Sequence, residues 1–136
     1  MKTKTLYRPV GEKEMILIAE SNFKKFPPRL DWQPIFYPVL NEKYTIEISS
    51  QWNTDDAFGN YVGFVTKFEI TEEEFLKHKI ENVGALHNDE LWVLAEDLET
   101  FNNSIVGCIE ITKVHIGEKF EKAANMVIEN IIAKYK

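Results

Sequence analysis

Short stretches of alternating apolar and polar residues recur along the chain, and this period of two is typical of half-buried β-strands. The clearest predicted strand is 61–70, which is rich in strand-forming Val, Phe and Tyr and is expected to be central. Further strands are predicted at 5–10, 35–39, 90–94 and 104–114. Gly107 falls inside the last of these and predicts a bulge there.

Other stretches repeat apolar residues every three or four positions, as amphipathic helices do. They predict short helices at 12–20 and 95–101. Thr71 followed by Glu74 forms a capping box, so the acidic residues after Thr71 are expected to be the first turn of another helix.

Two longer helical patterns lie in the middle and at the end of the chain. Asn41 is a suitable N-cap for a helix whose stripe of Tyr44, Ile48 and Trp52 should face the core. Toward the terminus, a strong helical period predicts an amphipathic C-terminal helix over about 117–135.

Three prolines exclude regular structure from the segment 26–34. Proline lacks a backbone donor and biases the residue before it toward extended conformations. We therefore expect a stiff loop that presents aromatic and cationic side chains, Arg29 among them.

The order of these elements indicates the fold class. It lacks the regular strand–helix alternation of a doubly wound sheet, which favours an α+β fold with a mixed or antiparallel sheet. The 136 residues suit one domain, with a core at about 3–114 and the C-terminal helix as an extension.

Charge is distributed unevenly along the chain, whose net charge is -6. Residues 1–30 hold seven Lys or Arg against three Glu, a net +4, so the remaining residues sum to -10. An acidic whole argues against general nucleic-acid binding, whereas the basic segment could hold a small anionic ligand. Both arginines of the chain, Arg8 and Arg29, lie in this segment.

Several kinds of site are not expected. Cys108 is the one cysteine, which excludes an intramolecular disulfide, and within its strand it suits a small buried hydrophobe. His78, His87 and His115 lack the paired spacing of metal ligands, so no metal is expected. Residues 1–5 are basic but lead into no long apolar stretch, so we expect no signal peptide, no membrane span and a cytoplasmic protein.

Four stretches resemble a short bacterial family named ADP-ribosylation/crystallin J: Leu6–Gly11, Ile35–Tyr44, His87–Val93 and Ile105–Glu110. The order of Arg8, Tyr37 and Glu90 is also similar to the three-part signature of ADP-ribosyltransferase folds. In that group a split, strongly bent β-sheet with helices at its edges holds NAD in a cleft.

The resemblance implies a role for each residue. Arg8 would contact the dinucleotide, Tyr37 would stack on the nicotinamide ring, and Glu90 would bond a ribose hydroxyl. A carboxylate at that place could stabilise the oxocarbenium-like sugar that forms when the glycosidic bond breaks. Arg29 could add a second contact to phosphate. Asn88 stands where transferases that modify arginine carry Gln or Glu, so transfer to a protein arginine is not expected.

Each of these residues also has a simpler interpretation. Arg8 could be an exposed strand residue paired with an acid, Tyr37 could be packing, and Glu90 could face solvent.

Three functions therefore remain open. The first is a domain that binds NAD or a related nucleotide and could cleave the nicotinamide bond. The second is a non-catalytic interaction or ligand-binding module, with the C-terminal helix pairing two copies as a homodimer. The third is hydrolysis or transfer on another phosphorylated or nucleotide-like substrate.

Overall fold

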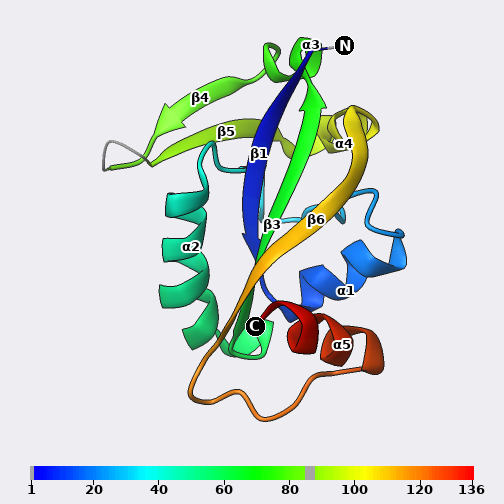
Figure 1. Cartoon of the computed structure of the whole chain (residues 1–136). Coiled ribbons are helices and arrows are strands. Elements are labelled where there is room, and N and C mark those ends of the chain that lie inside the picture. The colour runs from blue at the N-terminus through cyan, green and yellow to red at the C-terminus, as the bar shows by residue number, and fades with distance from the viewer. Residues whose placement is uncertain (1, 85–87) are drawn as a thin grey trace.

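The computed structural model describes residues 2–84 and 88–136, and they form an α+β fold with two antiparallel sheets (Figure 1). The larger sheet has the order β1-β3-β6, and the smaller has the order β2-β5-β4. The strands of the larger sheet are β1 Thr3–Val10, β3 Val62–Thr71 and β6 Ile105–Ile116. Those of the smaller are β2 Ile35–Phe36, β4 Lys79–Asn82 and β5 Asp89–Leu94. The expected central position of β3 is confirmed, whereas β4 was not predicted.

A single residue, Val39, joins the two sheets among the described residues. It forms antiparallel bridges to Tyr7 of β1 on one side and to Glu90 of β5 on the other. The Tyr7 and Val39 backbones exchange two hydrogen bonds, of 2.9 and 2.6 Å. The chain from β2 through Val39 therefore runs between the sheets as a short connecting strand.

Five α-helices accompany the sheets in the described part of the chain. They are α1 Glu12–Glu20, α2 Glu42–Gln51, α3 Glu72–Phe75, α4 Leu98–Asn103 and α5 Met126–Tyr135. The helix α2 lies against one face of the β1-β3-β6 sheet, and α1 and α5 lie against the other (Figure 1). None of these helices has the length and apolar composition needed to cross a membrane.

Side-chain caps mark the beginnings of the helices α2, α3 and α5. The side-chain Oδ1 of Asn41 accepts a hydrogen bond from the backbone N–H of Tyr44, which confirms the expected N-cap of α2. Thr71 caps α3 in the same way through the N–H of Glu74. A side-chain cap satisfies one of the N–H groups that the first helical turn leaves without a partner.

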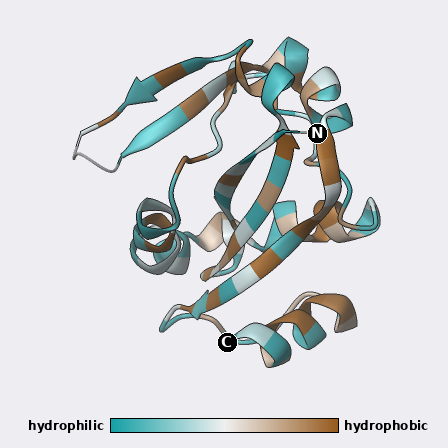
Figure 2. Cartoon of the chain, turned by 45° about the horizontal axis from the view of Figure 1, so that its top comes forward, coloured by the Kyte–Doolittle hydropathy of each residue, from teal (hydrophilic) through white to brown (hydrophobic). Residues whose placement is uncertain are grey.

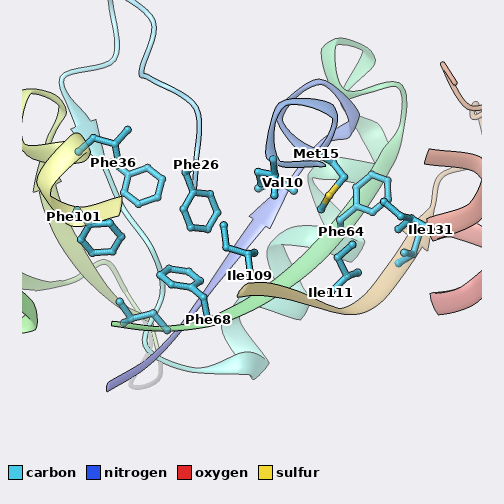
Figure 3. Close-up of a cluster of buried hydrophobic side chains, with 14 of the residues drawn as sticks. Val10, Met15, Phe26, Phe36, Phe64, Phe68, Phe101, Ile109, Ile111 and Ile131 are labelled. Atoms are coloured by element: carbon cyan, nitrogen blue, oxygen red, sulfur yellow. The ribbon is translucent and has the colours of Figure 1, made fainter. Parts of the chain in front are cut away.

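The core lies between the larger sheet and the two helices α1 and α5, and aromatic rings fill one end of it (Figure 3). Adjacent rings are 4.8 to 6.1 Å apart between centroids, at tilted or edge-on angles that aromatic pairs prefer. These rings belong to Phe26, Phe36, Phe68 and Phe101. The first half of β3 is buried on both faces, whereas apolar and hydrophilic residues alternate along its second half (Figure 2).

The expected core stripe of α2 is wrong. Trp52 is 71% exposed, and the buried residues of the helix are Thr45 and Ser49. The reason is close packing: a Cβ on Gly63 of β3 would collide with Ser49, so only small side chains fit between α2 and the sheet. The bulky residues of α2 are consequently turned away from this contact.

The expected burial of Cys108 is also wrong, because the thiol is exposed. The bulge predicted at Gly107 is present: this residue has φ +77°, and the register with β3 shifts between the partners of Lys67 and Glu69. An extra residue in one strand changes which side chains point inward beyond it. The buried residue of this part of β6 is accordingly Ile109.

The C-terminal helix begins at Met126, later than the expected 117, because Asn125 supplies its N-cap. The preceding segment is held to the domain by Glu12, whose buried carboxylate accepts the N–H of Ala124 at 3.0 Å and the side-chain amide of Asn60 at 3.1 Å. The apolar face of α5 then packs within the chain, against α1 and β6.

Candidate functional site

A cavity of about 470 Å³ lies beside the end of β1 and beside Val39. Its walls come from the end of β1, the first turns of α1, the proline loop 27–33 and α2. Three of the predicted site residues, Arg8, Arg29 and Tyr37, line it together. We call this space the arginine cavity.

Arg8 lies on the inward face of β1, opposite Thr66 in register and between Leu6 and Val10. Only 6% of the residue is exposed, so the interpretation of Arg8 as an exposed strand residue is wrong. Its guanidinium makes a two-pronged ion pair with Glu14 of α1, with Nε donating to Oε2 at 2.6 Å and a terminal nitrogen donating to Oε1 at 3.0 Å. Burial lowers the pKa of Arg8, but the negative charge of Glu14 and its neighbours outweighs this and raises the pKa overall.

Arg29 reaches the same place from the proline loop. Its Nε donates to the backbone carbonyl of Ile35 at 3.1 Å, which orients the guanidinium. Both arginines lie over the Phe36 and Tyr37 rings, with guanidinium carbons 4.6 to 5.9 Å from the ring centroids. Within the described residues Arg29 has no ion pair with a carboxylate. Burial and the charge of Arg8 lower the pKa of Arg29.

The far side of the arginine cavity carries residues that the sequence did not single out. The Nζ atom of Lys13 in α1 lies 4.0 Å from the centroid of the Phe58 ring. Phe58 itself is 61% exposed. Gly11 and Gly59 pack backbone to backbone, since a Cβ on Gly11 would lie 2.9 Å from the Cα of Gly59. Nothing in the sequence indicates that Glu14 pairs with Arg8, because an acid in the first turn of a helix is favoured by the helix dipole alone.

Glu90 does not line the arginine cavity. Its negative charge nevertheless contributes to the raised pKa of Arg8, more weakly than that of Glu14. The Glu90 carboxylate is buried and accepts hydrogen bonds from the Tyr44 hydroxyl and from Trp92 Nε1, both 3.1 Å long. Glu90 therefore does not face solvent, and its role on a ribose hydroxyl stays a prediction.

The contact between Glu90 and Tyr44 has a measurable effect on ionisation. Burial, followed by the charge and hydrogen bond of Glu90, raises the pKa of Tyr44 from 10.0 to about 12. Between these values the unfolded chain ionises this tyrosine and the folded chain does not, so its contribution to stability is lost as the pH rises through that range. We expect an ultraviolet titration to show one of the five tyrosines ionising late.

The variant Glu90→Gln should move this late ionisation toward the ordinary tyrosine value, because the negative charge is removed while the side chain keeps its shape. Glu47→Gln is the matched control, since Glu47 is the weakest cause of the shift. A titration unchanged in Glu90→Gln would contradict the hydrogen bond.

A second cavity, of about 670 Å³, shares Leu17, Pro27 and Pro28 with the first as lining residues. The charged residues that line it are mainly acidic, with Glu20, Glu96 and Glu99 against one lysine. Although larger, it offers no arginine, and its charge disfavours an anionic ligand. The arginine cavity is therefore the better candidate for such a ligand.

The two histidines that the structure describes have structural partners. His78 bonds the buried Glu74 at 2.6 Å, and His115 bonds the hydroxyl of Ser49 at 2.8 Å. His87 lies outside the described residues. Across residues 2–84 and 88–136, no group of three His, Cys, Asp or Glu side chains is placed to hold a metal ion.

Comparison with known proteins identifies no relative of this chain. No protein-family model, no curated protein and no solved structure matches the chain.

Proposed function

We propose that the arginine cavity binds an anionic nucleotide of the NAD or ADP type. The observation that carries the proposal is the pair of guanidiniums, Arg8 and Arg29, that lie over the same two aromatic rings in one cavity. Guanidinium forks match phosphate oxygens, and an aromatic face suits a planar base. The volume of about 470 Å³ falls within the range of small-molecule sites.

The charge balance supports an anionic ligand. The cavity is lined by three cations and two carboxylates, and the carboxylate of Glu14 is already paired with Arg8. Arg29 is half-buried beside another cation, a situation that the negative charge of a ligand would relieve. A phosphate placed between the two guanidiniums would therefore gain from both.

The resemblance to ADP-ribosyltransferase folds supports NAD in particular. Arg8 and Glu90 lie on strands of two different sheets, and Val39 connects these strands directly. Tyr37 precedes this connection and lines the cavity. A split sheet with a cleft beside the split is the arrangement that the resemblance implies.

The proposal concerns binding, not cleavage of the nicotinamide bond. Cleavage by Glu90 would need its carboxylate to reach the ligand, and both of its oxygens are engaged by Tyr44 and Trp92. The cavity lining, which does not include Glu90, supports the binding part of the function.

Calorimetric titration with NAD and with ADP tests the proposal. We expect both to bind, and we expect Arg29→Gln to weaken binding by about 10- to 100-fold, because a hydrogen bond to a charged group is worth roughly 1.5–3 kcal/mol. The measurement is the dissociation constant at fixed, stated salt.

Lys43→Gln is the matched control, because it removes one positive charge from an exposed position of α2 outside the cavity lining. It should leave both affinities unchanged. Absence of binding heat and of any thermal shift at millimolar NAD and ADP, with the protein folded, would refute the nucleotide site.

A further inference from the structure

The ion pair between Arg8 and Glu14 occupies the guanidinium edge that an anionic ligand would use. Both residues line the arginine cavity, and the pair is two-pronged, with contacts of 2.6 and 3.0 Å. Guanidinium binds carboxylate and phosphate with the same fork geometry. We propose that Glu14 is a built-in competitor for Arg8, which makes the cavity select pyrophosphate-bearing ligands over singly phosphorylated ones; this rests on the proposed function.

The difference in burial within the pair supports this competition. The Arg8 side chain is 7% exposed, whereas that of Glu14 is 22% exposed. A buried guanidinium remains charged and requires an anion beside it. Glu14, in the first turn of α1, is the partner that can turn toward water when another anion takes its place.

The number of charges on the ligand decides the outcome of this exchange. A single phosphate that displaces Glu14 replaces one anion with another at Arg8 and gains little. A pyrophosphate can take the place of Glu14 at Arg8 and also reach Arg29, which lies over the same aromatic rings. Glu14 therefore sets a minimum for the negative charge that a ligand must carry.

The test uses inorganic phosphate and inorganic pyrophosphate on the full chain. We expect wild type to bind pyrophosphate at least about tenfold more tightly than phosphate, and Glu14→Gln to raise the phosphate affinity by about tenfold. Glu20→Gln removes the same charge from an exposed position on the same helix and should change neither affinity.

Thermal unfolding supplies a second measurement. Glu14→Gln leaves the buried Arg8 without its carboxylate, so its melting temperature should fall and phosphate should raise it again, more than in wild type. Should this variant not fold, Glu14→Asp keeps the charge but shortens the reach, and is expected to bind phosphate more tightly than wild type.

The outcomes separate the two proposals. If wild type binds pyrophosphate but neither Glu14 variant gains affinity for phosphate, Glu14 is not a competitor and the nucleotide site stands. If wild type binds NAD or ADP but neither it nor the variants bind pyrophosphate or phosphate, the selection by Glu14 fails and the nucleotide site stands. If NAD and ADP do not bind either, both proposals fail.

Discussion

Removal of residues 117–136 is expected to leave a chain that does not fold at room temperature. The deleted part includes Ile128, Ile131 and Ile132, all of which are buried against the domain. At about 1.5–3 kcal/mol for each buried side chain, their loss amounts to roughly 5–9 kcal/mol, comparable to the roughly 5–15 kcal/mol that stabilises a typical domain. Circular dichroism should show no cooperative thermal transition.

Single substitutions within α5 separate its two faces. Ile128→Ala removes a fully buried side chain and should cost about 2–5 kcal/mol, whereas Val127 is 50% exposed and Val127→Ala should change stability by no more than about 0.5 kcal/mol. A truncated chain that melts cooperatively at the wild-type temperature would show that α5 is not part of the core. Because the inward face is used within the chain, a homodimer through this helix would have to use its outer face.

The variant Phe26→Ala is expected to lose about 3–5 kcal/mol of its free energy of unfolding, because removal of a fully buried ring leaves a cavity that its neighbours cannot fill. The ring lies 4.8 Å from Phe68 and 5.1 Å from Phe36 between centroids. Denaturant unfolding should show a lower midpoint with an unchanged slope.

The same residue anchors the loop that carries Arg29. The backbone N–H and carbonyl of Phe26 form two hydrogen bonds with the side-chain amide of Asn102, 2.9 and 3.0 Å long. These backbone bonds persist in Phe26→Ala, but the loop loses the ring that packs it into the core, so the variant should weaken nucleotide binding as well as stability. Phe58→Ala, at a ring that is 61% exposed, is the control for stability and should stay within about 0.5 kcal/mol of wild type. A wild-type midpoint for Phe26→Ala would contradict the described packing.

Local chemistry in the sequence was enough to predict most elements of the fold. The run of strand-forming residues in 61–70 predicted the central strand, and the caps at Asn41 and Thr71 placed two helix starts. These features depend on neighbouring residues alone. The exposure of Cys108 and of Trp52 depends instead on a bulge and on the tight approach of α2 to Gly63, which are properties of the packed structure.

The site was predicted less completely, for a similar reason. Composition placed both arginines in one basic segment, and the structure brings Arg8, Arg29 and Tyr37 to one cavity. The partner of Arg8 could not be foreseen, because an acid in the first turn of a helix has a sufficient local explanation. Glu90 has the expected place in the chain order, but its hydrogen bonds to Tyr44 and Trp92 depend on how α2 and β5 pack together, which the order of residues does not determine.

The connection through Val39 has a structural consequence. This residue bridges β1 to β5 and also lines the arginine cavity, so one wall of the cavity is formed at the point where the two sheets meet. A substitution that disturbed the Val39 bridges would therefore affect the contact between the sheets and the cavity wall together.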